Sequence, residues 1–526
     1  MSSGIPTPPP PAAADLPSPS SQREGGEAAT SVADQVLAAI DLGSNSFHMV
    51  VARLEHGRLS VLDRIREMVR LGAGLDENGH LSQAAADRAL DCLRRFRERL
   101  QSLNAESVRA VGTNTLRRAR DRDAFLARAS AALGHPIDVI SGVEEARLVY
   151  LGAAHDLPAD ADERLVVDIG GGSTELIVGR GYDAERLESL YMGCVSLSSA
   201  FFPEGRVTEK RFRLARIAAR QELEPVAPRF RGHGVQRAFG TSGTIRATAR
   251  MLSGDDNPSG IVTRRGLDRL EKQLVKAGDL RRRRPGGLGE QRAPVYPGGL
   301  AILIEVFEAL GIESLMAVDS ALREGLLYDM LGRMTDEDAR ERSVRSLESR
   351  FHVDTEHASR VESTALDIYG QLAADWDLSQ ELPKRLLRWA ARLHEIGLDI
   401  AHAKYQFHGA YLLRNADLAG FSTGEQLLLS TLVSNHRRKI RQETLEALPA
   451  AWRNTILRLA VVLRLAVLIN RSRSPDPQPV ISISTVRGGL RIGFPEGWLD
   501  AHPLTRADLQ QEKKYLSAAG VRLRAA

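Results

Sequence analysis

Two aspartates end short apolar runs, and each is followed at once by a glycine-containing turn. Asp41 follows Val36–Ile40, and Asp168 follows Leu165–Val167. A bend of this kind leaves backbone N–H groups free to bind phosphate, and its carboxylate can hold a hard cation. Two such bends that face each other would form a phosphate clamp.

A second apolar run follows each turn, at Phe47–Ala52 and at Glu175–Val178, so the same strand–turn–strand pattern occurs twice. A third glycine and hydroxyl turn starts at Gly240 and precedes a helical run. The N-terminus of a helix binds anions because its N–H groups and its dipole both point at the ligand. Arg117 could add a forked guanidinium donor. The hydroxyl groups that could bind phosphate oxygens belong to Ser44, Ser46, Ser173, Thr174, Thr241 and Ser242.

The two aspartates have two interpretations. A single aspartate before a glycine turn usually only forms that turn. An ionised group at the end of a buried apolar strand is costly without a partner, however, and hydrated Mg²⁺ is a natural partner for a carboxylate. Because the arrangement occurs twice, we expect Asp41 and Asp168 to organise a divalent cation.

A helix start at Ser141 presents two adjacent glutamates. Ser141 followed by Glu144 is a capping box, in which Ser141 caps the helix and the Glu144 side chain reaches back to the backbone. Glu145 lies about 100° further round the helix and is free to face elsewhere. The spacing alone leaves two options for Glu145, a cleft or an ordinary surface position.

The order of the elements indicates several domains, because 526 residues are too many for one core. Strand and helix patterns alternate first, which indicates an α/β class. From about Thr335 helix follows helix, until a proline-rich break at Ser474–Pro479 precedes a small hairpin. We predict a disordered tail at 1–35, α/β domains at 36–150 and 151–333, a helical domain at 334–474, and a small α+β domain at 475–526.

Composition narrows the class of protein. Hydrophobic residues make up 43% and charged residues 26%, as in ordinary globular proteins. No apolar run approaches the ~20 residues of an integral membrane span, and the first thirty residues lack the pattern of a secretory signal. Cys92 and Cys194 are the only cysteines, which is typical of a reducing cytoplasm and argues against a metal–thiolate site. We expect a cytoplasmic protein, with peripheral membrane association as an alternative.

Basic residues gather in two blocks, Arg281–Arg284 and Arg437–Arg441. Such blocks usually form solvated surface, and the functional alternative is attraction of a polyanion. Few aromatic residues accompany them, which argues against stacking on nucleic acid, so we expect no nucleic-acid partner.

A set of motifs in order resembles the exopolyphosphatase and guanosine pentaphosphate phosphatase family. The resemblance covers the chain from about Ala38 to its C-terminus and implies two actin-, sugar-kinase- and Hsp70-like domains of the ribonuclease H type, closing on a phosphate-lined cleft. One departure is Ser320, where the family usually has glycine. The motifs are Asp41–His48, Ile140–Arg147, Asp168–Glu175, Met192–Ser196, Gly240–Thr244 and Ala321–Gly325.

The resemblance also implies Mg²⁺-dependent hydrolysis of a terminal phosphoanhydride. By matching position, Glu145 would be the general base, while Asp41, Asp168 and Glu175 would organise the metal and the water. A homodimer is implied in the same way. Phosphate would be bound by Gly43, Ser44, Asn45, Ser46, Arg117, Gly170, Gly171, Gly172, Ser173, Thr174, Gly240, Thr241, Ser242 and Gly243.

The helical half contains His394 and Glu395 within a helical pattern, and it resembles the HD-type phosphohydrolase fold. In that fold the metal centre uses a His–Asp pair, and Glu395 stands in place of the aspartate. Because a longer side chain changes the reach of a metal ligand, we expect a non-catalytic domain whose histidines are structural or bind polyphosphate. The other histidines of this half are His357, His402, His408 and His436.

The motifs leave several functions open. Our first interpretation is a processive exopolyphosphatase acting on inorganic polyphosphate, which Gly172, Asn114 and His436 favour. The alternative is a phosphatase that converts guanosine pentaphosphate to the tetraphosphate, and Ala301–Val306 and Leu393–Leu398 resemble that branch equally. A third possibility is a sensor that binds polyphosphate or a guanosine polyphosphate without hydrolysis. A sugar kinase or ATPase would need an adenosine pocket, for which the sequence has no distinct signature.

Overall fold

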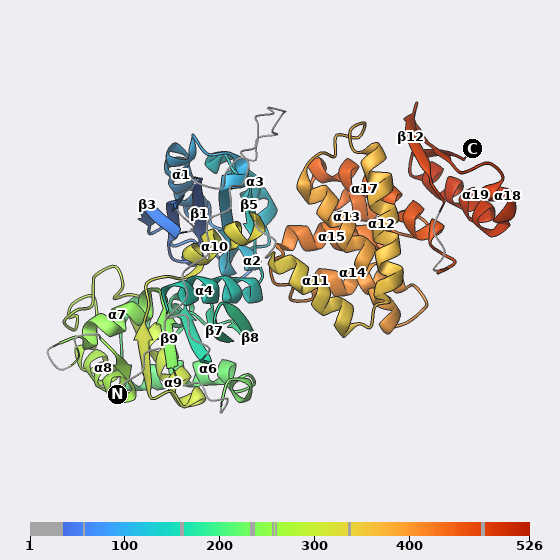
Figure 1. Cartoon of the computed structure of the whole chain (residues 1–526). Helices are drawn as coiled ribbons and strands as arrows, with labels where there is room; N and C mark the ends of the chain where they lie inside the picture. Colours follow the sequence, from blue (N-terminus) through green and yellow to red (C-terminus); the bar gives the residue numbers. More distant parts are fainter. Residues whose placement is uncertain are drawn as a thin grey trace, which may run out of the picture.

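The computed structural model describes residues 35–55, 58–157, 162–231, 237–254, 257, 260–334, 338–474 and 479–525. The predicted tail, apart from Gln35, lies outside the described residues. Within these ranges, every helix is too short or too polar to cross a membrane. Figure 1 shows two α/β domains stacked on one side of the molecule, the helical domain beside them, and the C-terminal piece at the far edge.

The first α/β domain contains a five-stranded sheet with the order β3-β2-β1-β4-β5. Strands β1, β2 and β3 are antiparallel, and β4 and β5 continue parallel to β1. The side chains of Leu37–Ile40 are completely buried, as expected of a central strand covered on both faces. The elements are β1 (Val36–Leu42), β2 (Phe47–Glu55), β3 (Arg58–Glu67), α1 (Gln83–Leu100), β4 (Val108–Gly112), α2 (Asn114–Arg118), α3 (Arg122–Leu133) and β5 (Ile137–Val139).

The second α/β domain repeats this plan in a six-stranded sheet with the order β10-β11-β9-β6-β7-β8. Strands β6, β7 and β8 are antiparallel, and β9 and β11 continue parallel to β6. Its elements are β6 (Arg164–Ile169), β7 (Thr174–Arg180), β8 (Asp183–Leu190), α5 (Cys194–Phe201), α6 (Glu209–Leu223), β9 (Arg237–Thr241), α7 (Ser242–Leu252), β10 (Val262–Thr263), α8 (Arg264–Ala277), α9 (Tyr296–Leu310) and β11 (Ser314–Ala317). The predicted α/β class and the repeated strand–turn–strand pattern are confirmed.

Two helices connect the domains, α4 (Gly142–Asp156) and α10 (Leu322–Met334). They pack on each other in a hydrophobic cluster that also takes side chains from β1 and β6. A Cβ atom at Gly325 would lie 1.8 Å from the carbonyl oxygen of Leu148, so glycine is needed for this close packing. The predicted boundary at residues 150–151 falls inside α4, because this helix contributes to the cores of both domains.

The helical domain follows, and the small C-terminal sheet shares its core. Ile483, Leu490 and Leu523 belong to the same buried cluster as Trp389 and Leu463, so the C-terminal piece is packed on the helices. The sheet has the order β12-β13-β14. The elements are α11 (Ala339–Arg350), α12 (Thr355–Leu372), α13 (Glu381–Leu393), α14 (Tyr405–Asn415), α15 (Thr423–Asn435), α16 (Gln442–Glu446), α17 (Ala450–Ile469), β12 (Ser482–Val486), β13 (Gly489–Gly493), α18 (Trp498–Ala501), α19 (Pro503–Ala518) and β14 (Arg522–Ala525).

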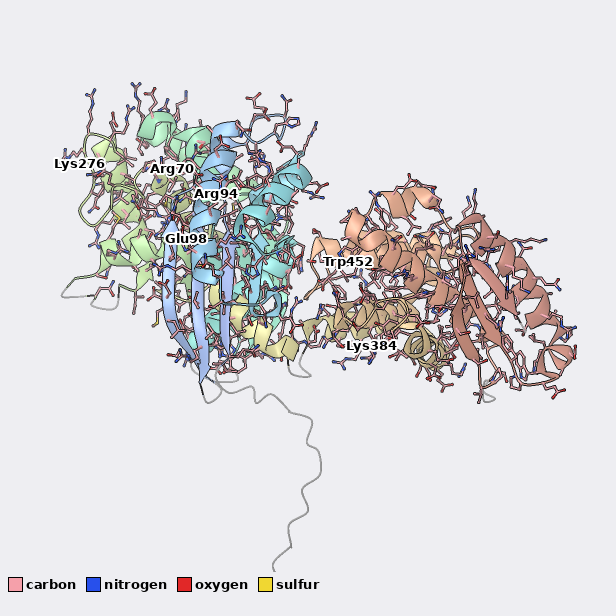
Figure 2. All side chains as sticks on the ribbon, turned by 90° about the horizontal axis from the view of Figure 1, so that it is seen from above. Arg70, Arg94, Glu98, Lys276, Lys384 and Trp452 are labelled. Atoms are coloured by element: carbon pink, nitrogen blue, oxygen red, sulfur yellow. The ribbon has the colours of Figure 1, made fainter. Side chains whose placement is uncertain are left out.

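The helical domain contacts the first α/β domain through the loop before α15. The Thr423 hydroxyl donates to the carbonyl of Val139 at 2.9 Å, and Ile140 forms an isolated bridge with Ser422. Seen from above in Figure 2, Lys384 and Trp452 lie on the helical part, while Arg70 and Arg94 lie on the α/β part beside it.

Candidate active site

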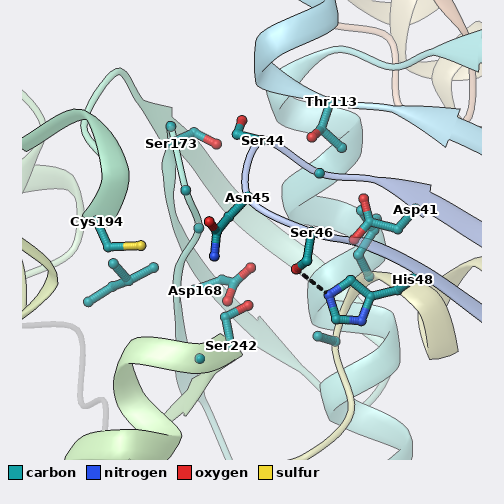
Figure 3. A pocket seen from close by; sticks show the side chains of 18 of the residues that line it. Asp41, Ser44, Asn45, Ser46, His48, Thr113, Asp168, Ser173, Cys194 and Ser242 are labelled. Carbon is teal, nitrogen blue, oxygen red and sulfur yellow. Dashed lines mark hydrogen bonds between the residues drawn. The ribbon is translucent and has the colours of Figure 1, made fainter. Parts of the chain in front are cut away.

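The two predicted turns face each other across a cleft of about 110 Å³ between the α/β domains (Figure 3). In the sheets, Asp41 lies opposite His48 and Asp168 lies opposite Glu175, so each aspartate stands at the mouth of its turn. The predicted residues that line the cleft are Asp41, Gly43, Ser44, Asn45, Ser46, Glu145, Asp168, Gly170, Gly171, Gly172, Ser173, Ser242 and Gly243.

The turns approach so closely that there is no room for a side chain at Gly171 or Gly172 of the second one. A Cβ atom at Gly171 would lie 3.0 Å from the Cβ of Ser44, and one at Gly172 would lie 2.5 Å from Oδ1 of Asn114. A Cβ atom at Gly193 would lie 2.4 Å from the backbone of Gly171. These glycines are therefore required by contact between chain segments, and the contact leaves backbone at the surface of the cleft.

A carboxylate cluster, comprising Asp41, Glu145, Asp168 and Glu175, occupies this region. Burial, followed by the nearby charge of Glu145, raises the pKa of Asp41 to about 8. Burial is also the main cause that raises the pKa of Glu145 and of Asp168. Burial together with Glu145 and Asp168 raises the pKa of Glu175 well above its ordinary value. Burial therefore disfavours the charged form of all four carboxyl groups.

The donor set of the cluster fits a divalent cation. Among the described residues, Oδ1 of Asp41 and Oε2 of Glu175 are buried without a hydrogen-bond partner. Carboxylate oxygens are the ligands that Mg²⁺ prefers, and a cation would stabilise the charged carboxylates that burial disfavours. Asp41 and Asp168 line the cleft and could hold the ion directly, whereas Glu175 is fully buried beside them.

Glu145 enters the cleft, which answers the question that its spacing left open. Glu145 is 8% exposed, and its side chain accepts a hydrogen bond from Arg117 at 2.8 Å. The same Arg117 nitrogen donates to the carbonyl of Ile140 at 3.1 Å. Arg117 therefore orients Glu145 and does not line the cleft as predicted for a phosphate ligand.

The predicted capping box is only half correct. Ser141 accepts from the backbone N–H of Glu144 at 3.1 Å, as expected. The Glu144 carboxylate, however, accepts from Arg147 at 2.7 and 2.8 Å and from the backbone N–H of Gly420 at 2.6 Å. Its structural task is thus to join α4 to the helical domain, because the Arg147 guanidinium of the same helix and the backbone amide of Gly420 compete better than the cap.

The third turn is built around Asp168. Thr241 donates its hydroxyl to Oδ1 of Asp168 at 2.6 Å, so it holds the aspartate and leaves the start of α7 without a side-chain cap. Ser242 adopts a left-handed backbone, with φ of 66°, a conformation that residues other than glycine seldom take. The uncapped N–H groups at the start of α7 are suited to bind an anion.

A relay of three side chains reaches the first turn. Arg323 can only donate, and it lies 2.8 Å from Nδ1 of His48, so this nitrogen accepts. The other ring nitrogen, Nε2, therefore carries the proton and donates to the Ser46 hydroxyl at 2.7 Å (Figure 3). Burial, followed by Arg323, lowers the pKa of His48 to about 2. The Ser46 hydroxyl proton remains available to donate to a ligand oxygen.

Sequence reasoning missed the cationic side of the cleft. Arg66, Arg246, Arg292 and Arg323 line it, and each also lowers the pKa of His48. Arg323 lies within the Ala321–Gly325 motif, so the resemblance contained a signal for it. The other three come from separate elements, and no local spacing connects them.

Two predicted phosphate ligands have other contacts. Thr174 is fully buried and donates its hydroxyl to the carbonyl of Met192 at 2.7 Å. Gly240 is inside β9, where a Cβ atom would lie 2.6 Å from Ile245 and 2.8 Å from Leu315. Neither residue lines the cleft; one joins β7 to the turn before α5, and the other lets β9 pack closely.

Two further cavities adjoin the cleft. The first, about 470 Å³, shares Ser44 and Asn45 with it and has apolar walls that include Phe202 and Leu280. Its polar groups include Arg281 and Arg284 of the first basic block, whereas Arg282 is 88% exposed at its side chain. The second, about 760 Å³, is lined by the arginines Arg66, Arg246, Arg250 and Arg292.

In the helical domain, His357, His394 and His436 are buried together, with ring centroids 5.7 and 5.3 Å apart in that order. His402 is exposed and His408 is half-buried. In the second basic block, Arg437 lies 4.6 Å over the Tyr405 ring and Arg441 lies 5.0 Å over the Phe407 ring. These arginines are stacked rather than fully solvated, and their attraction of a polyanion stays a prediction.

Comparison with known proteins gives a consistent assignment. Residues 50–334 match the model of the Ppx/GppA phosphatase family, and residues 339–513 match Ppx/GppA phosphatase, domain III. Proteins of Aeromonas hydrophila and Aeromonas salmonicida named guanosine-5′-triphosphate,3′-diphosphate pyrophosphatase are each 42% identical over 477 residues, which are 91% of this chain and 96% of theirs. The crystal structure of an exopolyphosphatase from Cytophaga hutchinsonii is 26% identical with a TM-score of 0.51, covering 56% of this chain and 98% of its own.

Proposed function

The chain belongs to the Ppx/GppA phosphatase family, and from this we propose that it removes the terminal 5′ phosphate of guanosine pentaphosphate. The products would be guanosine tetraphosphate and orthophosphate. This reverses the order of our sequence-based interpretations, in which exopolyphosphatase came first. The reason is that the relatives similar over 91% of the chain carry the nucleotide activity in their names.

The observation that carries the proposal is the cavity of about 470 Å³ beside the first turn. Its volume lies in the range of about 300–1,000 Å³ that is usual for small-molecule sites. Apolar walls at Phe202 and Leu280 suit a nucleoside, and Arg281, Arg284 and Glu290 could read the acceptors and donors of guanine. Inorganic polyphosphate has no apolar part that would use such a cavity.

In the proposed reaction, a water oxygen attacks the terminal phosphorus while the bond from phosphorus to the bridging oxygen breaks. Glu145 accepts the proton of that water, and Arg117 holds its carboxylate in position. The developing phosphate charge is stabilised by the start of α7, by Ser46 and by the cleft arginines. Mg²⁺ bound at Asp41 and Asp168, beside Glu175, would supply charge neutralisation and orientation.

A second candidate is hydrolysis of inorganic polyphosphate. The arginine-lined cavity of about 760 Å³ continues from the cleft and suits a string of phosphates. The structurally similar protein from Cytophaga hutchinsonii is named an exopolyphosphatase. The two candidates therefore use different cavities, which makes them separable.

The test compares phosphate release from guanosine pentaphosphate, long-chain polyphosphate and ATP, with and without Mg²⁺. We expect the highest kcat/KM for guanosine pentaphosphate. The double variant Arg281→Ala and Arg284→Ala should raise KM for that substrate about tenfold and leave polyphosphate unaffected. Its matched control, Arg282→Ala with Arg283→Ala, alters the same block outside the cavity.

The alternatives give different results. Preference for polyphosphate, with a KM that rises in Arg250→Ala but not in the Arg281 and Arg284 variant, would establish the second candidate instead. Binding without turnover of any of these substrates would favour the sensor. Turnover of ATP alone would refute both phosphatase proposals.

A further inference from the structure

The helical domain contains a buried cluster of potential metal ligands that is separate from the phosphate cleft. His357 lies in the first turn of α12, and His394 with Glu395 follows the end of α13. One ring nitrogen of each histidine and one carboxylate oxygen of Glu395 all lie within 4.8 Å of one another. The two histidines are 3% and 1% exposed.

The hydrogen bonds of His394 fix which nitrogen faces the cluster. Its Nδ1 lies 2.7 Å from the carbonyl oxygen of Ala391, which can only accept, so Nδ1 carries the proton. The opposite nitrogen, Nε2, then presents a lone pair. Among the described residues, this Nε2 and Nδ1 of His357 are buried without a hydrogen-bond partner. A buried polar atom without a partner is costly, which calls for an explanation.

Glu395 presents a free oxygen to the same space. Arg473 donates to Oε2 of Glu395 and, at 3.0 Å, to Asp354. The other oxygen, Oε1, lies 3.9 Å from Nε2 of His394, which is too long for a hydrogen bond. A lone pair and a carboxylate oxygen thus face each other inside the protein, an arrangement that a positive ion between them would stabilise.

We infer that His357, His394 and Glu395 bind a divalent transition-metal ion of the Zn²⁺ type. Imidazole nitrogens favour such ions over Mg²⁺ or Ca²⁺. Two histidines and one glutamate form a known kind of open zinc site, with bonds of about 2.0–2.2 Å and hence roughly 3.3 Å between neighbouring ligand atoms. The 3.9 Å pair would have to close by about 0.6 Å, and atoms at the 4.8 Å limit by about 1.5 Å, to reach this distance.

The residues around the cluster already hold His394 and Glu395 in the way that metal ligands are usually held. A ligating histidine usually donates its other nitrogen to a carbonyl or carboxylate, as His394 does to Ala391. Arg473 orients the Glu395 carboxylate through one oxygen and leaves the other free. The sequence-based expectation that the longer glutamate would not serve is thereby revised, since its oxygen reaches the cluster. This inference is independent of the proposed phosphatase activity.

A matched control lies next to the site. His436 is as deeply buried as His394 and also has its Nδ1 2.7 Å from a backbone carbonyl. Its Nε2, however, lies 3.4 Å from the Tyr405 hydroxyl, so it already has a partner. Substitution of His436 therefore perturbs the same part of the core without removing an inferred ligand.

The experiment titrates the full-length, chelator-treated protein with Co²⁺ and Zn²⁺ in excess Mg²⁺, which occupies oxygen-only sites. We expect one equivalent of Co²⁺ to bind with the visible absorption of a nitrogen-ligated, low-coordinate ion. His357→Gln and Glu395→Gln should each weaken binding at least tenfold, and His436→Gln should leave it unchanged. Circular dichroism checks that each variant is folded.

Several results would refute the inference. One is that the wild-type protein binds neither Co²⁺ nor Zn²⁺ under these conditions. Another is that binding survives both ligand substitutions. Metal that is lost in Asp41→Asn but kept in Glu395→Gln would belong to the phosphate cleft. If His357→Gln does not fold, the wild-type titration and the Glu395→Gln variant decide the question.

Discussion

Glu144 and Glu145 are neighbours in α4, and each belongs to a different cluster of buried charged residues. The two clusters differ in how completely their charges are paired. Glu145 belongs to the carboxylate cluster of the cleft, where burial and like charges raise pKa values. Glu144 belongs to a joint cluster of Arg109, Glu144, Arg147, Asp329 and Arg333, where every carboxylate contacts at least one guanidinium group. One turn of α4 thus supplies both groups.

The difference in charge pairing indicates that the joint cluster serves stability and the carboxylate cluster of the cleft serves function. In the joint cluster, the charges compensate one another and connect β4, α4 and α10; Arg333 and Glu144 also bond the backbone of Gly420 in the helical domain. In the cleft, the carboxylates are buried together, and among the described residues one oxygen of Asp41 and one of Glu175 lack a hydrogen-bond partner, which is unfavourable for the protein alone and favourable once a cation enters. Perturbed pKa values of this kind are typical of active sites.

The largest expected effect comes from Glu145→Gln. Loss of the base should lower kcat by about 10²–10⁴-fold while binding of guanosine pentaphosphate persists, because the phosphate-contacting groups remain. Phosphate release and equilibrium binding measure the two quantities. Stability should change less than in Glu144→Gln, because the remaining amide oxygen can still accept from Arg117 and burial already disfavours the charged carboxylate. Full turnover in this variant would show that another group activates the water.

The corresponding substitution in the joint cluster, Glu144→Gln, should lower the stability of the protein. Removing one partner of a buried ion pair typically costs about 3–5 kcal/mol, here because the negative charge beside Arg147 is lost and an NH₂ group replaces one of the two oxygens that accept from Arg147 and the Gly420 amide. Thermal unfolding should shift strongly, while the folded fraction keeps its kcat at low temperature. Glu98→Gln, on an exposed helix face (Figure 2), is the control. Equal stability of the two variants would contradict the division between the clusters.

Much of this arrangement follows from local sequence. The paired turns, the cap at Ser141 and the availability of Glu145 depend on residues close together in the chain. The partners of Glu144 do not, because Arg109, Asp329 and Gly420 come from distant segments that only the fold brings together. For the same reason the cleft arginines were missed.

The direction in which a side chain points is the other property that the sequence alone did not determine. Ser173 and Thr174 are neighbours with similar hydroxyls, yet Ser173 lines the cleft and Thr174 bonds Met192 in the interior. Successive residues of an extended segment point to opposite sides. A motif identifies both hydroxyls, whereas the register of β7 determines which one faces the cleft.

A smaller effect is expected when the two turns are pushed apart. Gly172→Ala places a Cβ atom 2.5 Å from Asn114 Oδ1, and overpacking of this kind costs about 1–3 kcal/mol. We expect kcat/KM to fall about 10-fold with little loss of the joint cluster's stability, because the change is confined to the cleft. In Gly286→Ala the new atom meets open space, and activity should be normal. Unchanged kcat/KM in Gly172→Ala would mean that the turns need not touch.

The smallest effect concerns pH. Burial alone would raise the pKa of Asp329, but Arg147, Arg109 and Arg333 together hold it well below its ordinary value. Its contribution to stability is therefore present above the unfolded pKa of about 3.9 and is lost as pH falls through the lower folded value. Between about pH 5 and 8, the contribution of Asp329 to stability should therefore be constant.

Urea unfolding at a series of pH values measures this contribution. Below about pH 4, wild type should lose stability more steeply than Asp329→Asn, which has no carboxylate to protonate. Asp91→Asn removes an exposed carboxylate paired with Arg94 and should leave the wild-type slope unchanged, because such surface pairs contribute little. If Asp329→Asn showed the same acid slope as wild type, the charge balance of the joint cluster would not be what joins the domains, and shape complementarity between α4 and α10 would have to do so.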